Sequence, residues 1–340
     1  MKHLSHFLIA ISSVTLLATQ QTIAAENSSA PIYQIELKAA TQLNRQASEL
    51  NQAVIDYCQD DQKTGLAPLK QQWLDTAQAW MALQGQAKGP EQAISLGWSM
   101  QFWPDKKDIT GRKMAQIIQQ PELWEPQTIA EQSVTVQSLG GLEWLLYDEK
   151  SSFAQGDKNA CSLAKAISQN FNHNTQKIVT AWQKNPWQGY SAAQWQSEYF
   201  GLLNNQMDYT LHKLQRPMGK IGHPKPYFAE SWRSQTSLVH IKSNLVAMKA
   251  LYQADGEHGL DALLRAKGES ELADRIVLHF EQAIATLPTS PSLFTQLQTK
   301  EGYKNMIAQY NKLEYVQYLL QQEAAVALGI VVGFNSTDGD

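Results

Sequence analysis

The sequence predicts an all-α protein made of two four-helix bundles in tandem. Apolar residues recur at helical spacing in almost every periodic segment, and no alternating run of strand length appears. The stretch NPWQGYS (185–191) breaks this pattern with proline and glycine near the middle of the 340-residue chain, a length that fits two domains. We therefore expect a first helical bundle over 26–187 and a second over 188–340.

Four helices are expected in the first bundle. The spacing of apolar residues predicts them over 35–57, 66–80, 128–147 and 160–182. The connection GQAKGPEQAISLGWSMQFWPDKKD (85–108) is long for a loop and carries Trp98, Phe102 and Trp103. This aromatic loop is either functional or a segment that packs over the end of the bundle.

The second bundle is also expected to contain four helices. They are predicted over 192–214, 238–252, 272–285 and 303–328. The first of them ends near RPMGKIGHPKP (216–226), which should be an extended loop because its prolines disfavour helical backbone in the residues before them.

Residues 1–25 have the pattern of a cleaved secretory signal peptide. A basic start precedes an apolar run (7–18) and the small residues Ala24 and Ala25. The run is too short to span a membrane, and no cysteine lies near the cleavage site to carry a lipid anchor. We expect an exported protein with no membrane span. The formal charge of −4 gives no indication of nucleic-acid binding.

The chain has two cysteines, Cys58 and Cys161. In an exported protein an even count favours a disulfide, which would tie the end of the first predicted helix to the start of the fourth. The alternative is two buried free thiols.

Several enzyme classes are excluded by inspection. The sequence contains no HExxH, GxSxG, P-loop or strand-linked GxGxxG motif. The histidines after the signal segment have no paired metal-ligand spacing, and we expect surface or capping roles for them: His173, His212, His223, His240, His258 and His279. The cluster Asp255, Glu257 and His258 is interpreted as a solvated turn.

The stretch QSLGGLEWLLYDE (137–149) places one carboxylate among leucines and aromatic residues. On a helix, apolar side chains surround Glu143 on both sides, so it should point into the core. A buried carboxylate needs a partner, a proton or a ligand. Gly140 and Gly141 also need a reason, because each costs roughly 1 kcal/mol relative to alanine inside a helix. Either another backbone packs against them, or Gly140 leaves room beside Glu143.

Several segments together resemble imelysin-like proteins. They are QFWPDKKDITGRKM, SLGGLEWLLYDE, HKLQRPMGKIGHPKPYFAESWRSQTSLVHIKSNLVAM and the ending LGIVVGFNSTDGD, in the expected order over nearly the whole chain. The resemblance implies a cell-envelope, periplasmic protein of two helical bundles, linked mainly with bacterial iron uptake and named after a member described as a peptidase. It also implies a site between the bundles, where a GxHxxE motif places His and Glu one turn apart.

That motif corresponds here to Ser138, Gly140 and Glu143, so the glutamate is kept and the histidine is replaced by glycine. Zinc catalysis needs about three protein ligands, and the motif offers one. We therefore expect no metal at the Gly140 and Glu143 positions. An arginine, lysine, tyrosine or backbone donor should hold Glu143 instead.

The resemblance is tightest at FWPD, GR, RPMG and ESWRS, which are polar or irregular stretches. We expect them to form the ligand site in the cleft between the bundles with these residues: Glu143, Gly140, Trp103, Asp105, Arg112, Arg216, Glu230 and Arg233.

Three functions remain open from the sequence. The first is a non-catalytic periplasmic protein of iron or related metal uptake that binds a small molecule, a metal or an envelope protein. The second is a metallopeptidase of the imelysin type, and the third is a helical interaction module with a vestigial site. The cofactor, with iron or another metal as candidates, and the oligomeric state are left open.

Overall fold

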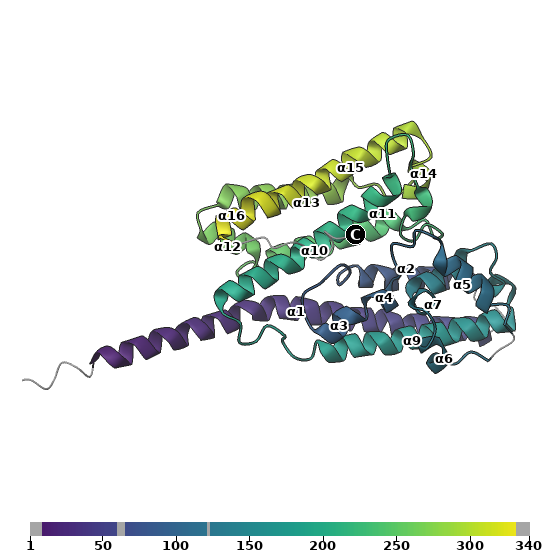
Figure 1. Cartoon of the computed structure of the whole chain (residues 1–340), viewed down its shortest axis with the longest axis horizontal. Helices are drawn as coiled ribbons and strands as arrows, with labels where there is room; N and C mark the ends of the chain where they lie inside the picture. The colour runs from purple at the N-terminus through teal and green to yellow at the C-terminus, as the bar shows by residue number, and fades with distance from the viewer. Residues whose placement is uncertain (1–8, 60–64, 121–122, 331–340) are drawn as a thin grey trace, which may run out of the picture.

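The computed structural model describes residues 9–59, 65–120 and 123–330, and within these ranges the chain folds into helices without a strand (Figure 1). The all-α prediction is confirmed. Figure 1 shows two groups of helices, with α1 to α9 on one side and α10 to α16 on the other. We call them the first and second helix groups. The GFN…DGD ending lies outside the described residues.

Three long helices form the frame of the first helix group. α1 (Ile9–Gln59) packs against both α2 (Leu66–Trp80) and α9 (Lys158–Ala181). In α2, Leu69, Trp73, Ala77 and Trp80 recur every three or four residues and are buried, which is the one-sided pattern that fixes a helix on a core. The predicted signal segment begins outside the described residues, and its described part opens α1.

The prediction of one helix over 128–147 is wrong. The structure divides this segment into α6 (Pro126–Ala130), α7 (Val134–Gln137) and α8 (Leu139–Tyr147). Ser133 and Ser138 interrupt it, because each adopts extended backbone and accepts a hydrogen bond from the first turn of the helix that follows. The fourth member of the first predicted bundle is therefore a set of short helices.

The predicted aromatic loop over 85–108 also contains helical turns. α3 (Glu91–Ser95) and α4 (Gly97–Met100) precede a cis peptide bond between Trp103 and Pro104, and α5 (Ile109–Ile117) follows. α3 packs against α9, and α4 packs against α7 and α9. The segment thus covers the first helix group and brings Trp103 to its junction with the second.

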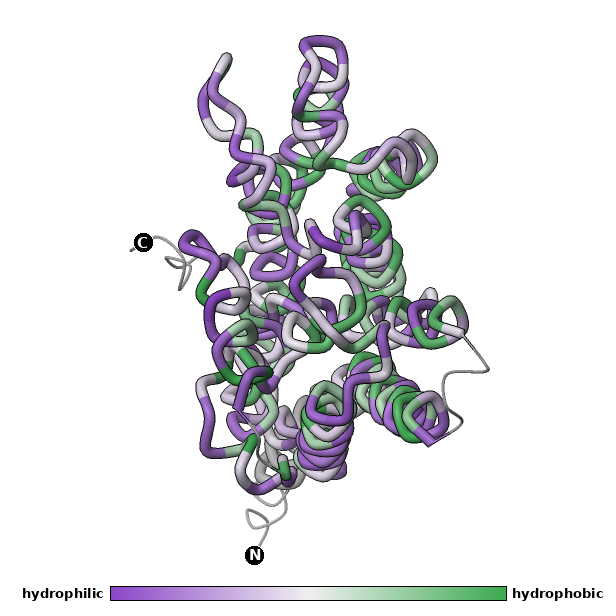
Figure 2. Tube along the Cα trace, turned by 90° about the vertical axis from the view of Figure 1, so that its right-hand side faces the viewer, coloured by the Kyte–Doolittle hydropathy of each residue, from purple (hydrophilic) through white to green (hydrophobic). Residues whose placement is uncertain are grey.

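Four long helices form the second helix group, as predicted. They are α10 (Ala192–Met218), α11 (Ser237–Gln253), α13 (Ser270–Thr286) and α15 (Lys300–Tyr318). The short helices are η2 (Pro226–Phe228), α12 (Leu260–Ala266), α14 (Leu293–Gln296) and α16 (Ala325–Leu328), with a π-helical turn, η3 (Leu319–Ala324), between α15 and α16. Figure 2 shows hydrophobic and hydrophilic residues interspersed along the helices. In α13, the buried Leu272, Ile276, Phe280 and Ala283 recur every three or four residues, as on a helix with one buried face.

The connection between the two helix groups is held by aromatic side chains. The predicted domain boundary falls in this stretch, between α9 and α10. Trp187 contacts Trp182 and Trp195 at ring-centroid distances of 5.4 and 5.1 Å, and Trp195 stacks on Tyr199. All four residues are buried. The connection is therefore packed into the core although its proline and glycine end the helical pattern.

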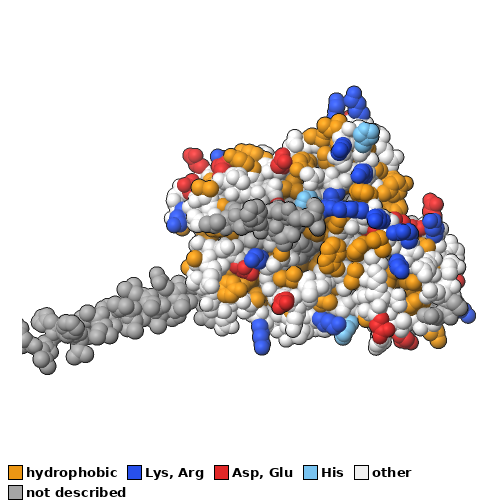
Figure 3. All heavy atoms as spheres, viewed as in Figure 1, with side chains coloured by type: hydrophobic (Ala, Val, Ile, Leu, Met, Phe, Trp, Pro, Cys, Tyr) orange, Lys and Arg blue, Asp and Glu red, His pale blue; other side chains and the backbone are white. Residues whose placement is uncertain are grey.

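Cys58 and Cys161 form the predicted disulfide, with a Cα–Cα distance of 5.7 Å. It joins the end of α1 to the start of α9, 103 residues apart in sequence. No helix in the described ranges has both the length and the apolar character needed to cross a membrane. On the face shown in Figure 3, several Lys and Arg side chains gather toward the junction of the two helix groups.

Candidate functional site

Glu143 lies on α8 at the junction of the two helix groups. Its side chain is almost fully buried, with 4% of the residue exposed. Trp73 on α2 donates its indole N–H to the backbone oxygen of Leu139 at 3.1 Å, which fixes the first turn of α8. The sequence-based expectation that Glu143 points inward agrees with this burial.

Gly140 and Gly141 occupy the first turn of α8, not the interior of a long helix as predicted. A Cβ on Gly141 would lie 2.6 Å from the backbone oxygen of Val136, so the preceding chain excludes any side chain there. A Cβ on Gly140 would lie 3.4 Å from Ser138 Oγ and 3.8 Å from Thr110 Cγ2, which are ordinary contacts. Both sequence-based explanations therefore apply, one to each glycine.

The carboxylate of Glu143 is held by Ser234 of the second helix group. Its Oε1 accepts hydrogen bonds from the backbone N and from Oγ of Ser234, each at 2.8 Å. Burial raises the pKa of Glu143, while these two bonds and the Arg233 guanidinium oppose that shift. Oε2 accepts no hydrogen bond from any residue in the described part of the chain.

Ser234 belongs to an irregular segment, 229–236, that joins η2 to α11. Ser231 and Gln235 have positive φ angles of 51° and 61°, which are uncommon for residues other than glycine. Such backbone persists where surrounding contacts over-determine it, and it is frequent at functional sites. Ser234 Oγ also contacts Ser231 O at 3.0 Å and Thr236 Oγ1 at 2.8 Å, which fixes the hydroxyl that faces Glu143.

Arg233 anchors this segment to the first helix group. Its guanidinium donates to Asp148 Oδ2 at 2.6 Å and to Asp108 Oδ1 at 2.7 Å, and it lies over the Trp232 ring at 4.2 Å. Asp108 caps α5, and Asp148 ends α8. Only 6% of the Arg233 side chain is exposed. The Arg233 guanidinium is therefore paired with two carboxylates, and its electrostatic interaction with Glu143 acts over a longer distance.

A buried ion pair lies behind Ser234. Lys213 Nζ on α10 is 2.5 Å from Glu230 Oε2, and both side chains are inaccessible to solvent. Although burial disfavours the Glu230 carboxylate, Lys213 and His240 outweigh it and hold the pKa of Glu230 well below its usual range. Gln84 donates to Glu230 at 2.5 Å, and Asn244 accepts from Lys213 at 2.7 Å, so the pair is closely hydrogen-bonded.

His240 connects this ion pair to Glu143. Its Nε2 is 3.2 Å from Thr236 Oγ1, and its Nδ1 is 3.6 Å from Glu230 Oε2. The predicted surface or capping role for His240 is wrong, because 1% of the residue is exposed. A path of polar side chains thus runs from Glu143 through Ser234, Thr236 and His240 to the ion pair.

A small cavity of about 30 Å³, which we call the Glu143 pocket, lies beside this path. Five of the sequence-predicted site residues line it: Trp103, Asp105, Gly140, Glu143 and Arg233. Thr110, Ser231 and Trp232 also line it, and none of the three was named as a site residue, although Ser231 and Trp232 belong to the ESWRS stretch. The volume suits one water-sized polar group.

The other predicted site residues lie outside the pocket wall. Arg112 is exposed on α5, and the Arg216 guanidinium lies over the Trp103 ring, 5.8 Å from its centroid. Glu230 sits one layer deeper, in the ion pair. Sequence reasoning missed Ser234, Thr236 and Lys213. Ser234 is part of the ESWRS stretch that it did single out.

The donors at the Glu143 pocket do not fit a transition-metal centre. Both carboxylate oxygens of Asp105 cap α5, accepting from Ile109 N at 2.7 Å and from Thr110 N at 2.8 Å. Gly140 supplies no side chain. Among the carboxylate oxygens of the described residues that line the pocket, only Glu143 Oε2 accepts no hydrogen bond. Within the described residues, no group of three His, Cys, Asp or Glu side chains is arranged to hold a metal ion.

The fold and the site define an all-α protein whose two helix groups enclose a buried carboxylate. A model of the imelysin family, which is described as peptidase family M75, matches residues 36–320. The chain therefore belongs to the imelysin family. No curated protein matches it.

Two solved structures are similar in fold. An imelysin-like protein from Psychrobacter arcticum 273-4 has 20% sequence identity and a TM-score of 0.76, with 91% of this chain and 96% of that chain covered. A putative iron-regulated protein A precursor from Parabacteroides distasonis ATCC 8503 has 16% identity and a TM-score of 0.66, with 87% and 95% covered. At such identities the likeness shows the fold alone.

Proposed function

We propose that this imelysin-family protein is a non-catalytic periplasmic component of iron or related metal uptake, and that it binds a ligand or protein partner at the Glu143 pocket. The observation that carries the proposal is the state of the Glu143 carboxylate. Oε1 is fixed by Ser234, whereas Oε2 is left to a group that enters the pocket. A buried acceptor of this kind favours occupation by a hydrogen-bond donor.

The size and charge of the pocket define what it accepts. About 30 Å³ admits one amino, ammonium or hydroxyl group at the tip of a ligand or of a partner side chain. The positive charge of Arg233 is balanced by Asp108 and Asp148. Arg233 therefore repels a cation that approaches Glu143 only weakly. Gly140 lines the pocket without adding a side chain to it. The pocket therefore selects a donor group and not a second acceptor.

Two observations support the link with iron and the export of the protein. The fold is shared with a protein described as an iron-regulated protein A precursor, and residues 1–25 have the signal-peptide pattern. Cell fractionation tests the export directly. We expect a periplasmic protein whose mass corresponds to cleavage after Ala25, and recovery of the uncleaved chain in the cytoplasm would contradict the proposal.

Growth under iron limitation tests the function. The gene is deleted and replaced by the wild-type gene, by Glu143→Gln or by Glu131→Gln, an exposed glutamate of the same helix group that serves as control. We expect slower growth of the deletion strain, rescue by wild type and by Glu131→Gln, and loss of rescue by Glu143→Gln. Equal growth of all strains would contradict the role in iron uptake.

A cleavage assay tests the non-catalytic part of the proposal. Purified wild-type protein is incubated with an unfolded protein substrate, with and without a chelator. We expect no cleavage above that of a mock preparation. Metal-dependent cleavage that the chelator stops and Glu143→Gln abolishes would establish a peptidase instead.

A further inference from the structure

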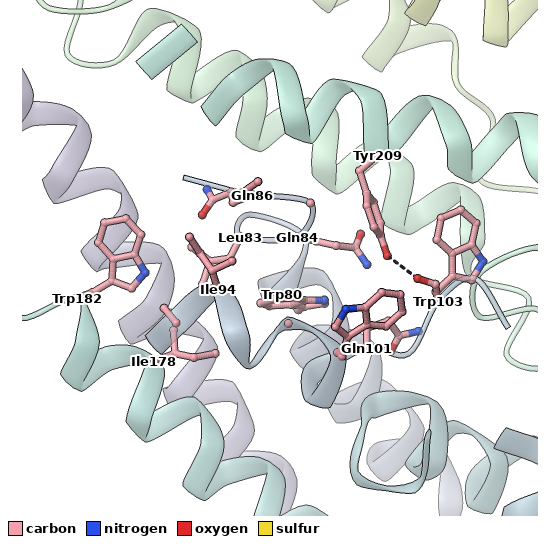
Figure 4. A pocket seen from close by; sticks show the side chains of 15 residues that line it. Trp80, Leu83, Gln84, Gln86, Ile94, Gln101, Trp103, Ile178, Trp182 and Tyr209 are labelled. Atoms are coloured by element: carbon pink, nitrogen blue, oxygen red, sulfur yellow. Dashed lines mark hydrogen bonds between the residues drawn. The ribbon is translucent and has the colours of Figure 1, made fainter. Parts of the chain in front are cut away.

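A second cavity, of about 260 Å³, shares Trp103 with the Glu143 pocket, and we call it the tryptophan cavity. Figure 4 shows Trp182 and Ile178 on one side of it, Trp103 and Tyr209 on the other, and Trp80 between them. These residues come from α2, from α9 and its C-cap Trp182, from α10 and from the 101–108 segment, so both helix groups form the cavity. Trp103 and Gln101 form a wall common to both cavities.

The walls of the tryptophan cavity consist of aromatic and aliphatic residues and three uncharged glutamines, Gln84, Gln86 and Gln101. Its lining side chains include no Asp, Glu, Lys, Arg or His among the residues that the structure describes. A cavity of about 150 Å³ with apolar walls is known to bind benzene, so 260 Å³ accommodates a molecule of one or two rings. Flat aromatic walls favour a flat aromatic occupant. A charged molecule would lose its hydration without gaining an ionic partner.

Two polar atoms of this wall are fully buried and have no hydrogen-bond partner in the described structure. Trp80 Nε1 and Gln101 Oε1 are buried and form no hydrogen bond within the described structure, although their residues are only 6% and 8% exposed. Two further polar side chains of the cavity, Gln84 and Tyr209, are committed to partners. Gln84 binds Lys213 and Glu230, and the Tyr209 hydroxyl donates to Trp103 O at 3.4 Å. These two buried atoms, one donor and one acceptor, would each gain a partner from an occupant.

We propose that the tryptophan cavity is a binding site for a small neutral aromatic molecule with a hydrogen-bond acceptor and a donor, of the aromatic carboxamide class. The ring lies among the tryptophans, the carboxamide oxygen accepts from Trp80 Nε1, and the amide N–H donates to Gln101 Oε1. This site does not depend on the function proposed for the Glu143 pocket. Trp80 lines the tryptophan cavity and does not line the Glu143 pocket.

Benzamide is a suitable probe, and benzoate is its matched control, since the two have nearly the same shape and differ in charge at pH 7. In a ¹⁵N-labelled sample of the full chain without its signal segment, the indole N–H signal of Trp80 is assigned by its loss in Trp80→Phe. We expect benzamide to shift this signal downfield in a saturable manner in the millimolar range, as a fragment of this size binds. Benzoate should leave it in place.

Variants locate the site. Trp80→Phe keeps the ring and removes the N–H, and Gln101→Met removes the acceptor at similar size. Each should weaken benzamide binding at least fivefold, measured from the remaining shifted signals. Trp124→Phe is the matched control, because Trp124 Nε1 is equally buried and unpartnered but lies outside the cavity. It should bind benzamide as wild type does.

The wild-type titration alone can overturn the proposal. It fails if benzamide produces no saturable shift of the Trp80 signal, or if benzoate shifts that signal equally. It also fails if Trp124→Phe weakens binding as much as Trp80→Phe does, since the effect would then not be specific to the cavity. None of these outcomes bears on the growth phenotype of Glu143→Gln, so the two proposals are tested separately.

Discussion

Glu143 and Ser234 are 91 residues apart in sequence, and two hydrogen bonds of 2.8 Å join the Glu143 carboxylate to the backbone and hydroxyl of Ser234. This contact links α8 of the first helix group to the segment before α11 of the second. One oxygen of a single side chain thus fixes the junction, and the residue also lines the Glu143 pocket. The proposed binding at this site would therefore use a different oxygen of Glu143 from the one that holds the junction.

Glu143→Gln and Glu143→Ala should separate these two roles. Glutamine keeps a carbonyl that accepts from Ser234, so its free energy of unfolding should stay within ~1 kcal/mol of wild type. Alanine leaves the Ser234 N–H without its acceptor in a buried site and should cost about 2 kcal/mol or more. Urea unfolding measures both. Equal destabilisation by the two variants would show that the charge, and not the hydrogen bonds, stabilises the junction.

The two glycines of α8 should respond differently to alanine. Gly141→Ala places a Cβ 2.6 Å from Val136 O, where backbone must move, and we expect a loss on the order of 2 kcal/mol in unfolding free energy. Gly140→Ala meets its nearest neighbour at 3.4 Å and should be neutral or slightly stabilising, because alanine favours the helix. Thermal unfolding compares them. A destabilising Gly140→Ala together with a neutral Gly141→Ala would reverse this assignment.

Glu36 on α1 should make the protein less stable as the pH rises. Burial raises its pKa from 4.5 to about 8, against the opposing hydrogen bond from Gln86. The folded state therefore keeps a proton that the unfolded chain releases, and stability is lost progressively between pH 4.5 and about 8. The loss is on the order of 3–5 kcal/mol.

Glu36→Gln should remove this part of the pH dependence, because the amide does not titrate. Urea unfolding at pH 5 and pH 8.5 measures the effect. We expect the variant to be more stable than wild type at pH 8.5 and similar at pH 5. Glu49→Gln, an exposed position on the same helix, should behave as wild type does. A parallel decline in wild type and Glu36→Gln would contradict the prediction.

The Cys58–Cys161 disulfide should contribute on the order of 4–5 kcal/mol, because it closes a loop of about one hundred residues in the unfolded chain. The double variant Cys58→Ser with Cys161→Ser should therefore unfold at a lower temperature than wild type. Reductant should lower the unfolding temperature of wild type and leave that of the double variant unchanged. If reductant left the unfolding temperature of wild type unchanged, the disulfide would not contribute to stability and the prediction would be wrong.

The long helices and the disulfide were predictable because they follow from local signals. Helical periodicity gives α2, α9, α11 and α13 almost residue by residue, and an even cysteine count in an exported chain gives the disulfide. The division of 126–147 was missed, because the two serines that cap α7 and α8 lie in a stretch that retains an apolar pattern. At such serines the side chain can cap a new helix instead of continuing the old one. The spacing of apolar residues does not distinguish these two outcomes.

The site was predictable in part. The burial of Glu143 follows from its apolar neighbours, and the resemblance placed Trp103, Asp105 and Arg233 near it. The pairing of Lys213 with Glu230 was not predictable, because it depends on the register between α10 and the segment before α11, which no local pattern encodes. The burial of His240 was not predictable for the same reason, because a histidine on a helix can lie either on the surface or in a buried polar path.

The central claim is that the Glu143 pocket binds a donor group and is not a transition-metal centre. The most direct measurement is calorimetric titration of zinc and ferrous iron into wild type, Glu143→Gln and Gly140→His. We expect wild type and Glu143→Gln to bind these metals equally weakly, and Gly140→His to gain affinity, because the open space at Gly140 then carries an imidazole one turn from Glu143. Tight binding by wild type that disappears in Glu143→Gln would contradict the claim and place a metal at the centre of the function.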